Sequence, residues 1–84
     1  MNYFVYIVYS EELNRYYIGH TSEPISERLR KHLSNHSGYT SKAKDWVVKY
    51  TESYPTKREA YARELAIKKK KSIKFIQDLI SSAG

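Results

Sequence analysis

The segment Tyr3–Tyr9 limits the fold more than any other part of the sequence, because all seven of its residues are aromatic or β-branched. Such residues favour strands, and a run without polar alternation is typical of a strand covered on both faces. The polar segment Ser10–Asn14 follows, and Arg15–Gly19 has a second strand-like pattern. A connection this short joins antiparallel strands. These residues therefore predict a β-hairpin whose second strand ends at Gly19.

The middle of the chain predicts a helix and a third strand. Pro24 suits the first turn of a helix, and Ile25, Leu29 and Leu33 follow at helical spacing. We therefore expect a helix over 24–33 with one apolar stripe against the sheet. After a polar loop that ends at Asp45, the segment 46–51 predicts a third strand.

The last third of the chain predicts two more helices. Thr56 and Glu59 have the spacing of a capping box, and Ser72 is expected to cap the final helix. The buried stripe of that final helix is predicted to be Ile73, Ile76, Leu79 and Ile80. The resulting order β-β-α-β-α-α predicts an α+β fold, a small three-stranded antiparallel sheet flanked by helices.

Length and composition narrow the class of protein. With 84 residues we expect one domain over 1–84, frayed at 81–84. The absence of cysteine excludes disulfides and cysteine-ligated zinc. A net charge of +6 is typical of proteins that bind polyanions, although many ordinary solvated domains share it. No run of ~18 apolar residues and no signal-peptide pattern is present, so we expect a cytoplasmic protein with no membrane partner.

Several side chains could carry chemistry. On a hairpin centred between Glu11 and Glu12, Tyr6 and Tyr17 would face the same side, where they could act on a phosphate or simply pack together. Arg28 and His32 lie four residues apart on the first predicted helix, a spacing that suits either phosphate binding or a solvated face.

Glu64 is predicted to share a helix face with Ala60 and Ile67. A carboxylate beside an apolar stripe costs free energy unless it is paired or binds a cation. It could pair with Arg63 or Lys68, lie at the edge of the stripe, or hold a metal ion. The remaining basic residues could contact a nucleic-acid backbone, and this set comprises Lys42, Lys44, Lys68, Lys69 and Lys71. The three histidines do not form a zinc site by their spacing.

Together these positions resemble the GIY-YIG nuclease superfamily, especially its small stand-alone bacterial members. The match consists of Tyr6, the sequence Tyr-Tyr-Ile-Gly-His-Thr at 16–21, Arg28 with His32, and Arg-Glu-x-x-Ile-Lys at 63–68. The first signature here is Phe-Val-Tyr at 4–6 and lacks its glycine. A late asparagine found in some branches of the family has no counterpart after residue 35.

The resemblance implies a metal-dependent endonuclease that hydrolyses phosphodiester bonds in DNA, for which repair or recombination is one expected setting. The sequence leaves open whether the substrate is branched, damaged or single-stranded DNA, or RNA. Glu64 would bind one Mg²⁺ or Mn²⁺, and Arg28 would contact the scissile phosphate. One of Tyr6 and Tyr17 would be the general base while the other orients the water, and His32 would shuttle the proton. The oligomeric state stays open between a monomer and a weak dimer.

Two other functions remain open at this stage. The first is a non-catalytic nucleic-acid-binding module that retains the nuclease fold. The second is an adaptor domain that binds a protein through its aromatic surface. Salt separates these two, because nucleic-acid binding weakens steeply as the salt concentration rises and apolar protein contacts do not.

Overall fold

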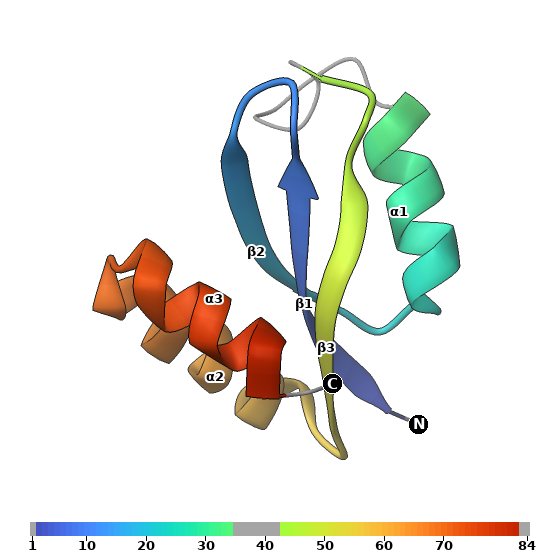
Figure 1. The fold of residues 1–84 in the computed structure, drawn as a ribbon. Coiled ribbons are helices and arrows are strands. Elements are labelled where there is room, and N and C mark those ends of the chain that lie inside the picture. The colour runs from blue at the N-terminus through green and yellow to red at the C-terminus, as the bar shows by residue number, and fades with distance from the viewer. Residues whose placement is uncertain (1, 35–42, 83–84) are drawn as a thin grey trace.

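The computed structural model describes residues 2–34 and 43–82 and confirms the predicted α+β fold. Its elements follow the expected order (Figure 1): β1 (Tyr3–Ser10), β2 (Arg15–Thr21), α1 (Ile25–Ser34), β3 (Val47–Tyr54), α2 (Lys57–Lys70) and α3 (Ile73–Ser82). The three strands form one antiparallel sheet in the order β2-β1-β3, so the apolar strand β1 is central and β2 lies at an edge.

The hairpin register differs from the prediction by two residues. Ser10 pairs with Arg15 and Tyr6 pairs with Gly19, which centres the turn between Glu12 and Leu13. Because the shift is even, Tyr6 and Tyr17 still face the same side of the sheet, as expected. Strand β2 also continues past Gly19 to Thr21, so the prediction that this glycine ends the strand was wrong.

The sheet separates two hydrophobic clusters, which is why β1 is buried on both faces. One cluster lies under α2 and α3 and includes Val5, Ile7 and Ile67. The other lies under α1 and includes Tyr6 and Trp46. Figure 1 shows α1 on one side of the sheet and the pair α2–α3 on the other. None of the residues 25–31 of α1 is fully buried, and this helix packs on the sheet through the partly buried Ile25 and Leu29.

The predicted caps are present. Thr56 Oγ1 accepts a hydrogen bond from the Glu59 amide at 3.2 Å, and Ser72 Oγ accepts one from the Phe75 amide at 3.1 Å. Helix α3 continues to Ser82, further than expected, and residues 83–84 lie outside the described part. Ile73 is 61% exposed, which corrects the prediction that it belongs to the buried stripe.

Side-chain bonds fasten the periphery to the core. Asp45 accepts hydrogen bonds from Ser10 Oγ at 2.6 Å and from the Glu12 amide at 2.8 Å, which ties the segment before β3 to the β1–β2 turn. These bonds, that from Ser10 above all, lower the pKa of the Asp45 carboxyl below its ordinary value.

None of the helices in the described ranges is long and apolar enough to cross a bilayer.

Candidate active site

The phenol of Tyr6 lies directly over Gly19 on the α1 side of the sheet. Tyr6 is 2% exposed, and the two residues are paired across β1 and β2. A Cβ atom at position 19 would lie 2.5 Å from Tyr6 Oη and 2.7 Å from its Cζ, closer than real contacts allow. Glycine is therefore required at position 19 because the tyrosine ring occupies the space of a side chain.

Arg28 reaches from α1 to the same phenol. Its Nε donates a hydrogen bond to Tyr6 Oη at 3.3 Å, and this bond raises the pKa of the guanidinium. Burial raises the pKa of Tyr6, and the bond and charge of Arg28 offset that effect only in part. Tyr6 is therefore a neutral phenol near pH 7, and its oxygen accepts a hydrogen bond from Arg28.

Tyr17 lies beside Tyr6 on β2. The ring centroids are 6.5 Å apart and tilted by 36°. Lys68 Nζ approaches the ring of Tyr17 from α2, at 5.9 Å from the centroid. The helices α1 and α2 cover opposite faces of the sheet. Because β2 is an edge strand, side chains from both helices can reach its open edge.

Glu64 is the buried carboxylate of this region, at 6% exposure. Its face of α2 also carries Ala60 and Ile67, as predicted. Each carboxylate oxygen has a partner, since Oε1 lies 2.5 Å from His20 Nδ1 and Oε2 accepts from Lys68 Nζ at 2.6 Å. The carboxylate is close enough to the phenol of Tyr6 to contribute to its raised pKa. Of the two expected salt-bridge partners, Lys68 is thus found, whereas Arg63 bonds to Glu52 instead.

His20 is the site residue that sequence reasoning missed. Its ring contacts Glu64 and also lies 5.3 Å, centroid to centroid, from the ring of Tyr61. The strand was predicted to end at Gly19, which left His20 outside it. The alternation of Tyr16, Ile18 and His20 would have placed this histidine on the face of the sheet that α2 covers.

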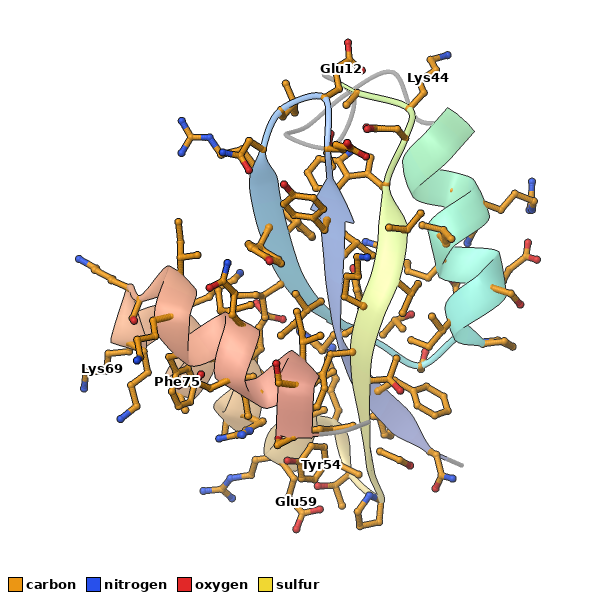
Figure 2. All side chains as sticks on the ribbon, in the orientation of Figure 1. Glu12, Lys44, Tyr54, Glu59, Lys69 and Phe75 are labelled. Atoms are coloured by element: carbon orange, nitrogen blue, oxygen red, sulfur yellow. The ribbon has the colours of Figure 1, made fainter. Side chains whose placement is uncertain are left out.

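The remaining predicted site residues are His32 and the five lysines, and they do not all lie near the tyrosines. His32 belongs to α1, one turn after Arg28, but its side chain lies outside the described part, as does Lys42. Lys68, Lys69 and Lys71 lie at the C-terminal end of α2. Figure 2 shows Lys44 at the same end of the fold as Glu12 and far from Lys69, so the predicted backbone-binding lysines do not form one cluster.

Glu64 is the residue of this region that could hold a divalent cation. A single buried carboxylate is a hard oxygen ligand of the kind that Mg²⁺ uses while it retains most of its water. Within residues 2–34 and 43–82, no group of three or more His, Cys, Asp or Glu side chains could enclose a metal ion. An ion at Glu64 would share the carboxylate with His20 and Lys68.

The comparisons with known proteins identify the family of the chain. A solution NMR structure of a UPF0213 protein from Bacillus halodurans superposes with a TM-score of 0.61 and is 29% identical, covering 100% of this chain and 87% of that one. No curated protein matches the chain. The model of the GIY-YIG catalytic domain matches residues 2–75, which include the tyrosines, Arg28 and Glu64. The chain therefore belongs to the GIY-YIG family, whose domain is of the nuclease type and implies a nucleic-acid substrate.

Proposed function

We propose that this protein is a metal-dependent endonuclease that hydrolyses phosphodiester bonds in DNA. The observation that supports this most is the meeting of two phenols, a guanidinium and a buried carboxylate around the edge strand β2. Phosphodiester hydrolysis requires neutralisation of the phosphate, an activated water and stabilisation of the leaving oxygen. The four groups at Tyr6, Tyr17, Arg28 and Glu64 match these requirements. Repair or recombination, in which branched or damaged DNA is cut, is the setting that we propose.

The protein's own groups have distinct roles in this mechanism. Arg28 binds a non-bridging oxygen of the scissile phosphate and offsets its charge in the transition state. Tyr6, held neutral by burial, donates a hydrogen bond that orients the phosphate or the water. Glu64 would hold the divalent cation, which would supply positive charge to stabilise the leaving oxygen.

Tyr17 is the better base of the two tyrosines in this arrangement. It is less buried than Tyr6, so its phenol is more accessible to the attacking water. Tyr17 takes the proton of the attacking water as the new P–O bond forms and the bond to the 3′ oxygen breaks. His32, one turn after Arg28, passes the proton on to solvent.

The test is nicking of supercoiled plasmid and cleavage of a branched DNA with Mg²⁺ or Mn²⁺. Wild type should cut, and Glu64→Gln should lose cleavage by about 10²-fold or more, as expected when a transition-state charge contact is removed. Glu59→Gln is the matched control, because it lies on the same helix and glutamine also serves in a capping box. Undiminished cleavage by Glu64→Gln would remove the metal-site assignment.

One observation favours a second candidate, a binding module without turnover. Both oxygens of Glu64 are paired within the protein, so the carboxylate is satisfied without a metal ion. In that case wild type binds nucleic acid in a salt-sensitive way but cuts neither substrate. Glu64→Gln would then reduce thermal stability while the melting temperature of wild type does not respond to Mn²⁺.

A further inference from the structure

A cavity of about 250 Å³ opens between the edge strand β2 and the junction of α2 with α3. Its floor is apolar and consists of isoleucines from three elements, Ile18, Ile67 and Ile76, with the exposed Ile73 at its mouth. The wall on the β2 side is Tyr16. No step of the proposed cleavage uses this space.

The rim of this cavity is cationic. Arg15, Lys68 and Lys71 line it, and among the described residues that do so there is no Asp or Glu. An apolar, aromatic pocket surrounded by positive charge complements a flat apolar group attached to a polyanion. That description fits a nucleobase on its phosphate backbone, and sites for single-stranded nucleic acid combine the same two features. Asn14, also in the lining, adds an amide that can bond to a base edge.

The cavity is joined to the candidate active site through one residue. Lys68 lines the cavity, and its Nζ donates to Glu64 Oε2 at 2.6 Å. A strand with a base in the cavity therefore has its backbone near the carboxylate. The volume is slightly smaller than the range of ~300–1,000 Å³ for sites that take drug-sized ligands, which suits a single ring system.

We propose that this cavity binds an unpaired nucleobase of the strand that is cut. The proposal rests on the proposed function and names its substrate class, which is nucleic acid with unpaired bases next to the cleaved phosphate. A base in an intact duplex is stacked and paired, so it reaches the cavity only after it leaves the helix, which costs a few kcal/mol. Branched ends, gaps and damaged sites provide such bases without that cost.

The test measures binding in the presence of EDTA, so that it does not depend on cleavage. Fluorescence anisotropy compares a short oligothymidylate with an abasic oligomer of the same length and charge. Wild type should prefer the base-bearing oligomer by about tenfold, in line with the contribution of stacking a base. It should also bind the single strand more tightly than the matching duplex.

Two variants locate the effect. Ile73→Gln changes the mouth of the cavity at an exposed position and should bring the preference for bases to within about twofold. Leu65→Gln is the matched control, since Leu65 is also an exposed apolar helical residue, at 46%, and does not line the cavity. It should leave the preference unchanged.

The outcomes separate this inference from the proposed function. Equal binding of both oligomers by wild type, or tighter binding of duplex, would overturn the base-binding cavity even if the enzyme cuts DNA. Equal loss in Ile73→Gln and Leu65→Gln would place the base elsewhere on the protein and overturn it too. A preference lost only in Ile73→Gln, together with no cleavage of any substrate, would support the cavity and reject the endonuclease.

Discussion

Arg28 Nε donates to Tyr6 Oη across 3.3 Å, and this bond joins α1 to the central strand. The arginine is thus held by a buried partner before any phosphate arrives. Arg30, two residues later, bonds instead to the exposed Glu27 of its own helix. The two arginines therefore provide a matched pair that differs in whether the guanidinium reaches the phenol.

The first prediction concerns this pair. Arg28→Lys should lower the single-turnover rate of cleavage by about 10²-fold or more, because lysine cannot reproduce the planar fork that contacts a phosphate. Arg30→Lys should stay within about twofold of wild type, as expected for an exposed pair. Equal losses in the two variants would mean that contact with Tyr6 does not select the phosphate-binding arginine.

The second prediction concerns the fit of Tyr6 over Gly19. Gly19→Ala forces the phenol to move, and overpacking of this kind costs about 1–3 kcal/mol in the free energy of unfolding. In a Tyr6→Leu background the same substitution should cost clearly less, because the ring atoms it meets are gone. A double-mutant cycle by urea unfolding measures the coupling. An identical cost in both backgrounds would contradict the steric explanation.

The third prediction concerns alkaline stability. Burial, followed by the hydrogen bond from its hydroxyl to Glu52 Oε1 at 2.6 Å, raises the pKa of Tyr54 from 10.0 to about 12. The folded state retains this proton more tightly than the unfolded state. The resulting stabilisation is therefore present in full below pH 10 and is lost as pH rises through the folded pKa of about 12.

Urea unfolding between these pH values checks the sign. The free energy of unfolding of wild type should fall more steeply with pH than that of Tyr54→Phe, while the lysines contribute alike to both. Tyr61→Phe, at an exposed tyrosine of α2, is the control and should follow wild type. If the free energy of unfolding of wild type falls with pH no more steeply than that of Tyr54→Phe, then burial and the bond to Glu52 do not raise the pKa of Tyr54.

The fourth prediction concerns the end of α2. Lys71 has φ 49° and ψ 38°, a left-handed conformation that costs a residue with a side chain roughly 1–2 kcal/mol and costs glycine little. Lys71→Gly should therefore raise the melting temperature. Lys69→Gly, inside the helix, should lower it. Both variants should bind DNA more weakly, since each loses one positive charge. A lower melting temperature in Lys71→Gly would contradict the prediction.

The architecture could be predicted from the sequence because its signals are local. The uninterrupted run of aromatic and β-branched residues predicts the central strand β1. The capping box at Thr56 and Glu59 predicts the start of α2, and the short connection predicts that β1 and β2 are antiparallel. Tyr6 and Tyr17 were correctly predicted to face the same side, because side chains alternate between the faces of a strand and a shift of two residues leaves each on its face.

The predictions from the sequence were wrong at residues whose position depends on contacts between distant parts of the chain. Gly19 is typical of a strand end, but it lies inside β2 because the ring of Tyr6 needs its space. His20 became a partner of Glu64 through a contact between residues 44 positions apart, which no spacing rule reveals. Ile73 fits the apolar period of α3 but borders a cavity, since α3 meets α2 at that point and leaves its first turn open.

The thin packing of α1 has a kinetic consequence. A helix with no fully buried residue among 25–31 can detach at a lower free energy than global unfolding, as weakly packed segments commonly do. Amide hydrogens over 28–31 should then exchange with deuterium well before those of β1. Each such opening carries Arg28 away from Tyr6, so the fraction of time that α1 is docked sets an upper limit on how often the site is assembled.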